Sequence, residues 1–133
     1  MKTYTEYLYS LANFSVTVRI IEHLRDRYQS TLDSLAVINL IDRWLVKVNL
    51  KHSIDIESAK NLQAFLSEMG VSYQPTAQIA TALARLEAGE SSTEIMNREQ
   101  VVIVTHGKPD REEIEIFRAQ IVKRLGYCPQ NMT

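Results

Sequence analysis

Three histidines, His23, His52 and His106, are the first side chains in this sequence that could do chemistry, because imidazole can act as a base or bind a metal. They are far apart, and no pair has the spacing of a metal motif such as His-x-x-x-His. His23 has two carboxylates close in sequence, Glu22 and Asp26, and the exposed face of a helix explains that pattern equally well. We therefore predict no metal site and no bound cofactor.

The segment 105–110 (THGKPD) has one feature of a phosphate-binding loop, a Gly-Lys pair before a predicted helix. It lacks the second glycine and the Gly-Lys-Ser/Thr order of the P-loop. A turn followed by Asp110 as the cap of a helix accounts for the same residues. Glu112, Glu113 and Glu115 then lie in the first turns of that helix, where its dipole favours negative charge without any catalytic role.

Cys128 is the single cysteine, and it could act as a nucleophile only if the fold brought a histidine to it. It stands in the uncharged segment 127–133, which favours an inert thiol. With no nucleophile–base pair evident, we predict no catalytic residue. The sequence favours a non-enzymatic protein over an enzyme.

Residues 59–86 have the outline of a helix-turn-helix, with Gly70, Val71 and Ser72 in the position of the turn. Pro75 falls inside the expected recognition helix, and the segment has only two basic residues with which to contact phosphates. The net charge of the whole chain is −1, which does not favour nucleic acid as a partner. A nucleic-acid-binding regulator is therefore the alternative hypothesis.

The four glycines predict the fold. Gly70, Gly89, Gly107 and Gly126 each follow a segment that can be interpreted as a helix, and glycine is the preferred residue just past a helix end. Apolar residues recur at helical spacing in four segments. These are 4–18, 36–48, 55–69 and 110–125, with Val46 as a misfit in the second. We predict an all-α fold: one domain over residues 1–133, a compact bundle of about five to six helices.

An α+β fold is the alternative, because three segments can also be interpreted as strands. Residues 14–21 alternate between apolar and polar and are rich in β-branched side chains, as strands are. Residues 44–51 also fit a period of two, and residues 101–105 form a short apolar run that periodicity does not assign. The strands of this alternative would lie near 14–21, 44–51 and 101–105.

An excess of apolar and tyrosine side chains near the N-terminus favours a protein-interaction function. If 4–28 were one straight helix, its early apolar stripe and its later one (Ile20, Ile21, Leu24, Tyr28) would face different directions. One of them would then need a partner, and symmetric pairing is the commonest solution. We predict a homodimer and a small helical adaptor or regulator that also binds another protein. The predicted partner-binding residues are Tyr4, Tyr7, Tyr9, Leu11 and Phe14.

Cysteine content and hydropathy bear on the compartment. A lone cysteine is typical of a reducing environment, and residues 1–6 lack the apolar segment of a secretory signal. No run of apolar residues is long enough to cross a membrane. We expect a cytoplasmic protein without a membrane partner.

Overall fold

A five-stranded antiparallel sheet lies at the centre of the protein, in a computed structural model that describes residues 6–133. The strand order is β4-β1-β3-β2-β5. The strands are β1 (Glu6–Leu11), β2 (Leu32–Asn39), β3 (Trp44–Leu50), β4 (Val71–Ser72) and β5 (Val102–Gly107). The prediction of an all-α bundle is therefore wrong, and the chain has an α+β fold.

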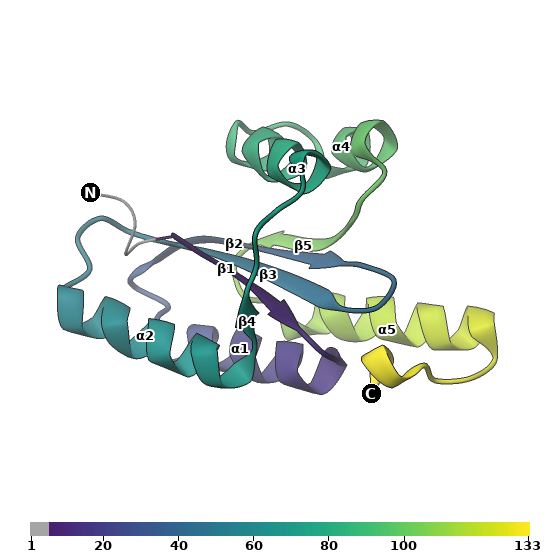
Figure 1. The fold of residues 1–133 in the computed structure, drawn as a ribbon, viewed down its shortest axis with the longest axis horizontal. Helices are drawn as coiled ribbons and strands as arrows, with labels where there is room; N and C mark the ends of the chain where they lie inside the picture. The colour runs from purple at the N-terminus through teal and green to yellow at the C-terminus, as the bar shows by residue number, and fades with distance from the viewer. Residues whose placement is uncertain (1–5) are drawn as a thin grey trace.

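Helices cover both faces of the sheet (Figure 1). One face carries α1 (Phe14–Arg27), α2 (Ile56–Met69) and α5 (Arg111–Leu125), and the other carries α3 (Ala77–Glu87) and α4 (Ser92–Glu99). A short 3-10 helix, η1 (Gln130–Met132), packs beside α1. Two separate apolar cores result, one on each side of the sheet.

The segment predicted as a helix over 36–48 instead forms parts of β2 and β3, joined by a short turn. Trp44, Val46 and Val48 point into the larger core under α1, α2 and α5, whereas Leu45 points into the smaller core under α3 and α4. A central strand that is buried on both faces has few polar positions. The sequence of such a strand therefore resembles that of a buried helix, which explains the error.

The N-terminal segment predicted as a helix over 4–18 divides into a strand and a helix. β1 ends at Leu11, and α1 begins at Phe14 after Asn13, whose side-chain oxygen accepts a hydrogen bond from the Val16 amide at 3.0 Å. The strand proposed near 14–21 in the alternative prediction is also wrong, because these residues belong to α1. Asn13 is a good helix cap, and it outweighs the β-branched residues that follow. β3 and β5 do lie where that alternative places its other two strands.

Two predicted helices are confirmed, and both begin at an aspartate cap. The predicted segments 55–69 and 110–125 correspond to α2 and α5. Asp55 accepts a hydrogen bond from the Ser58 amide at 2.7 Å, and Asp110 accepts one from the Glu112 amide at 2.9 Å. The hydrogen bonds from Ser58 hold the pKa of Asp55 below its ordinary value.

The glycines do not all play the predicted role of a helix stop. Gly126 ends α5 in the left-handed conformation, with φ of 77°, as predicted. Gly70 follows α2 in an extended conformation, and a Cβ atom there would lie 2.3 Å from the carbonyl oxygen of Ser10. Gly70 thus lets the end of α2 approach β1. Gly107 ends a strand, so the expectation of a helix before it is wrong.

Candidate protein-interaction surface

His23, which could have been a metal ligand, packs against aromatic rings between α1 and α2. Its ring stacks on Phe65 with centroids 3.8 Å apart and an interplanar angle of 12°. Burial lowers the pKa of His23, the positive charge of Arg27 lowers it further, and Asp26 acts in the opposite direction. The adjacent carboxylate of Glu22 binds Arg111. Residues 6–133 contain no group of three or more potential ligands that could hold a metal ion.

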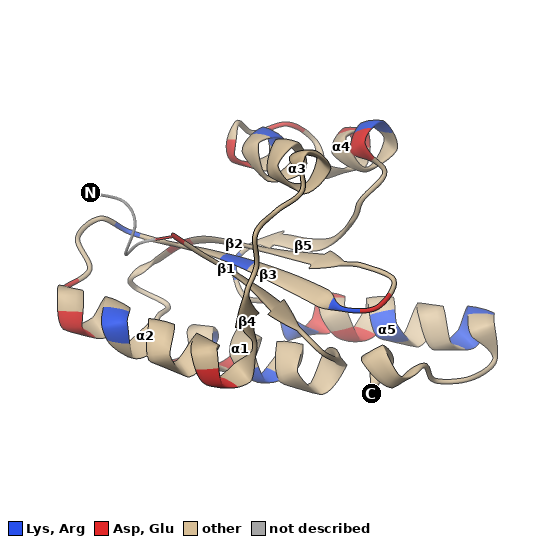
Figure 2. Ribbon diagram, viewed as in Figure 1, with Lys and Arg blue, Asp and Glu red and all other residues tan. Residues whose placement is uncertain are grey.

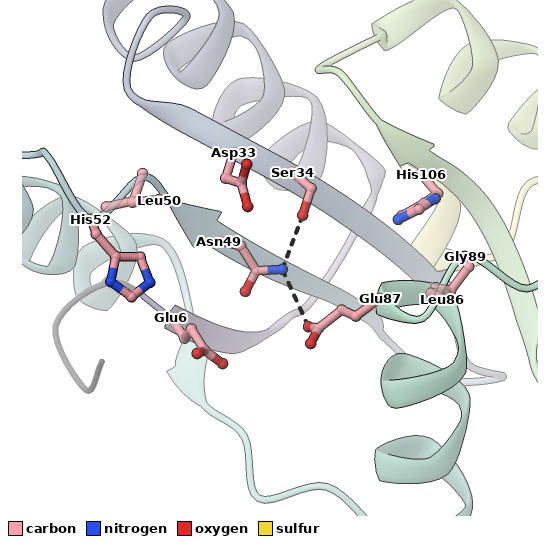
Figure 3. Close-up of a pocket in the computed structure, with 10 residues that line it drawn as sticks. All are labelled: Glu6, Asp33, Ser34, Asn49, Leu50, His52, Leu86, Glu87, Gly89 and His106. Carbon is pink, nitrogen blue, oxygen red and sulfur yellow. Dashed lines mark hydrogen bonds between the residues drawn. The ribbon is translucent and has the colours of Figure 1, made fainter. Parts of the chain in front are cut away.

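The other two histidines line a polar cavity of about 480 Å³ on the α3 side of the sheet (Figure 3). His52 lies at one end beside Glu6, and His106 lies at the other end, on β5. Asn49 occupies the middle and donates hydrogen bonds to Ser34 Oγ at 3.0 Å and to Glu87 Oε2 at 3.2 Å. The Ser34 hydroxyl is thus bonded to an amide and not to a base that could activate it.

An ion-pair network that includes two residues of the polar cavity, Glu6 and Glu87, joins the sheet to α3. Lys47 on β3 lies 3.0 Å from Glu87 on α3 and 3.7 Å from Glu6 on β1. The same Glu87 accepts the hydrogen bond from Asn49. These contacts hold the end of α3 against the sheet, so the network has a clear structural role.

A second cavity, of about 510 Å³, is bordered by basic side chains from three segments of the chain. Arg25, Lys51 and Lys108 line it together with Asp33, and all four are exposed. Lys or Arg and Asp or Glu occur together on several helices, including α2 and α5 (Figure 2).

The predicted helix-turn-helix over 59–86 is not formed. α2 packs in the larger core on one face of the sheet, and α3 packs in the smaller core on the other. The connection between them passes along the edge of the sheet as β4 (Figure 1). A helix-turn-helix needs two helices in direct contact, which this arrangement excludes for α2 and α3.

The residues predicted to bind a partner lie mostly inside the protein. Tyr7, Tyr9 and Leu11 of β1 are buried in the larger core, and the Tyr9 hydroxyl makes a hydrogen bond of 2.9 Å with Ser67 of α2. Phe14 is half-buried beneath Arg118. Tyr4 lies outside the described residues. The exposed large apolar side chains of the described chain lie elsewhere and form an accessible surface.

Such a surface follows one side of α5. The first part is a cavity of about 310 Å³ between β5 and α5, and the second is a cavity of about 370 Å³ between α5, the β2–β3 turn and the C-terminal segment. The first is lined by Ile103, Val104, Glu113, Ile116, Phe117 and Gln120. The second is lined by Asn39, Ile41, Ile121, Arg124, Leu125, Tyr127, Pro129, Asn131 and Met132. We call these residues together the α5 groove.

Exposed apolar side chains gather at the α5 groove. Of the seven large apolar side chains exposed among residues 6–133, four line it: Ile41 (99% exposed), Ile116 (50%), Leu125 (48%) and Tyr127 (62%). A fifth, Val102, is next to Ile103 of the first cavity in sequence and opposite Asn39 of the second cavity in the sheet. Single exposed apolar residues are ordinary in proteins, but several that border two cavities along one helix mark a candidate interaction site.

Ile41 is the most exposed of these residues, and its backbone is held in place. It lies in the turn between β2 and β3, and its backbone carbonyl oxygen accepts a hydrogen bond from the side-chain amide of Asn131 at 3.0 Å. Asn131 is itself fixed, because its carbonyl oxygen accepts a hydrogen bond from the Trp44 indole at 2.8 Å. The turn and the C-terminal segment thus form a fixed wall for this end of the groove.

Sequence reasoning did not find the α5 groove, although two signals pointed to it. In the predicted helix over 110–125, Ile116 is two positions from Ile114, so these two apolar residues cannot lie on the same side of the helix. Ile41 is followed directly by the charged pair Asp42 and Arg43, as is typical of a turn at the surface. Only the structure shows that both residues border the same surface.

The chain was compared with protein-family models, curated proteins and solved structures. No protein-family model matches the chain, and no curated protein matches it. Among solved structures, the chain is similar to the crystal structure of the C-terminal domain of YpbH, with 17% sequence identity and a TM-score of 0.49. That similarity covers 84% of this chain and 96% of the other. Within residues 6–133, the helices are too short or too polar to cross a membrane.

Proposed function

We propose that this chain is a protein-interaction domain and that the α5 groove is its binding surface. The observation that carries the proposal is the gathering of exposed apolar side chains at that groove, four of seven among the described residues. Exposure of each of these apolar side chains to water is unfavourable in free energy, and contact with a partner removes that unfavourable exposure.

The composition of the groove supports a protein as the ligand. Tyr127 and Arg124 border it, and tyrosine and arginine are enriched at the energetically important positions of interfaces. Edge strand β5 forms one wall of the groove, and the backbone groups of an edge strand remain available to pair with another chain.

A photo-cross-linking amino acid placed at Gln120 tests the proposal in cells. Gln120 lines the groove and is exposed, so its replacement leaves the core intact. We expect the probe to form specific protein adducts, which mass spectrometry of the purified adducts then identifies. Adding Ile116→Glu to the same chain should remove them, because a buried charge opposes apolar contact.

The matched control carries the same probe at Gln63, an exposed position on α2 away from the groove. A second control adds Ile56→Glu, which changes an exposed apolar residue outside the groove. The Gln63 probe should yield none of the adducts, and Ile56→Glu should leave the adducts at Gln120 unchanged. Adducts that form equally at both positions, or that survive Ile116→Glu, would refute the assignment of the groove.

A further inference from the structure

We propose that the α5 groove is occupied by a second copy of this chain, with the two α5 helices antiparallel about a twofold axis. This inference rests on the proposed function and names the partner of the same surface. The charges along α5 are complementary to themselves when one copy of the helix is reversed against the other.

A stripe of four residues runs along the groove side of α5. Glu113, Phe117, Gln120 and Arg124 are spaced by four, three and four positions, so they lie above one another on one side of the helix. Phe117 and Gln120 line the groove between the two charged residues. Ile116 and Ile121 flank the stripe on its two sides, so the middle of this surface is largely apolar.

The charges at the two ends of the stripe are opposite. The first turns of α5 contain Glu112, Glu113 and Glu115, and its last turn contains Lys123 and Arg124. In an antiparallel pair centred beside Arg118 and Ala119, Glu113 of each copy lies level with Arg124 of the other. The symmetry forms this ion pair twice, once at each end of the apolar contact.

Both charged groups have bonding capacity left within one copy. The Arg124 guanidinium forms no ion pair and no hydrogen bond with another residue of the described chain, 6–133. Glu113 accepts a hydrogen bond from the Thr105 hydroxyl at Oε1, at 2.9 Å, which leaves Oε2 for another donor. By contrast, Arg111 on the same helix is already paired with Glu22 and Glu115. Both residues at the ends of the stripe can therefore pair with another molecule.

Charge exchange tests the dimer directly by sedimentation velocity at several protein concentrations and at low salt. We expect the wild-type chain to show a reversible monomer–dimer equilibrium. Glu113→Arg alone and Arg124→Glu alone should each raise the dimer dissociation constant about tenfold or more, because each replaces two attractions with two repulsions. High salt should narrow the difference between wild type and variants.

A mixture of the two single variants gives the most specific result. Two copies of the same variant repel each other, because like charges then face each other at both ends of the stripe. In a mixed pair, the introduced arginine of one copy faces the introduced glutamate of the other. At the opposite end, the native Arg124 of the first copy faces the native Glu113 of the second. We therefore expect the mixture to form dimers, and we expect the double variant Glu113→Arg/Arg124→Glu to dimerise about as well as wild type. Circular dichroism and thermal melting establish that each variant is folded. Glu57→Arg and Lys60→Glu on α2 are the matched controls and should not change association.

The outcomes separate this inference from the proposed function. A wild-type chain that stays monomeric at all concentrations, or single variants that fail to associate when mixed, overturns the second copy as occupant. If the Gln120 probe then still captures another protein in a manner sensitive to Ile116→Glu, the groove remains a binding surface for that protein. If the chain does not associate with itself and the Gln120 probe captures no protein in a manner sensitive to Ile116→Glu, both proposals are wrong.

Discussion

Helices α1 and α5 lie on the same face of the sheet and have nearly the same length, but they use their apolar residues differently. α1 has five buried residues, Thr17, Val18, Ile20, Ile21 and Leu24, whereas α5 has one, Ile114. The remaining apolar residues of α5, which include Ile116 and Leu125, are half-buried or exposed. α1 therefore serves the core, and α5 retains apolar surface that the fold itself does not use.

The contrast follows from where each helix lies. α1 contacts α2, α5, β3 and η1, so it is enclosed on several sides. α5 lies beside edge strand β5, where no further strand covers it. Apolar residues at an open edge of a fold are therefore better evidence for a binding surface than apolar residues that neighbouring helices enclose.

The largest effect is expected for Leu24→Ala in α1. Leu24 is completely buried, and the substitution leaves a cavity that should lower the free energy of unfolding by about 2–5 kcal/mol. Urea denaturation followed by circular dichroism measures this change in the free energy of unfolding. Arg19→Ala, on the exposed side of α1, is the control and should change stability by less than about 0.5 kcal/mol. A loss below about 1 kcal/mol for Leu24→Ala would mean that α1 is not a core helix.

A smaller effect is expected at the cap of α1. Asn13→Ala removes the oxygen that accepts the Val16 amide and should cost about 1 kcal/mol. Asn13→Ser retains an acceptor at the same position and should recover most of that loss. If both substitutions cost the same, the hydrogen bond is not what stabilises the start of α1. Equilibrium unfolding of the three proteins side by side decides between these results.

The third prediction concerns how the stability of the protein depends on pH through His23 of α1, which packs against aromatic rings and not at the α5 groove. Because the folded pKa of His23 is lowered, the unfolded chain takes up the proton more readily. The contribution of His23 is therefore fully present above the unfolded pKa of about 6.5 and is lost as the pH falls through that value toward the folded pKa.

Replacement of the histidine isolates this contribution. His23→Gln should flatten the decline in the free energy of unfolding between about pH 7 and pH 5, measured by urea denaturation at each pH. His52→Gln, which changes an exposed histidine, should leave the decline in place. Equal slopes for wild type and His23→Gln would show that burial of His23 does not control the decline.

The smallest effect on stability is expected for Ile116→Ala in α5. Half of this side chain is exposed, so its truncation should change the free energy of unfolding of the monomer by less than about 0.5 kcal/mol. Ile114→Ala, two positions earlier and fully buried, should cost about 2–5 kcal/mol. Thermal melts at a protein concentration low enough to keep the chain monomeric provide the measurement. Similar losses at the two positions would make Ile116 a core residue and weaken the assignment of the groove.

The sequence predicts α2 and α5 well, because both helices have an aspartate cap and an apolar stripe on one side. It reveals the sheet only in part, because the α+β alternative places strands correctly near 44–51 and 101–105 but has none at β1, β2 or β4. Val46, the misfit in the predicted helix over 36–48, is in fact the mark of a strand, since Trp44, Val46 and Val48 share one face at a period of two. The remaining apolar residues of β2 and β3 hide that period because the opposite face is buried as well.

The binding surface is harder to predict than the fold, because it depends on which apolar residues remain uncovered. Tyr7 and Ile116 are both apolar residues in segments with an apolar stripe, yet one is buried and the other is half exposed. Burial depends on contacts between distant segments, such as the packing of Tyr7 beneath α2, where its hydroxyl donates to the Ala59 carbonyl oxygen. No local pattern contains that information.

The strand order has a consequence for how the chain folds. Three neighbouring strands of the sheet, β1-β3-β2, come from the continuous segment 6–50, whereas β5 follows only after α2, α3 and α4. Closing the long connection to β5 carries the larger entropic cost, so we expect the first segment to assemble before β5 joins it. Until then the outer edge of β2 is open, and an open apolar edge can pair with other unfinished chains. The arrival of β5 is therefore the step at which aggregation competes with folding.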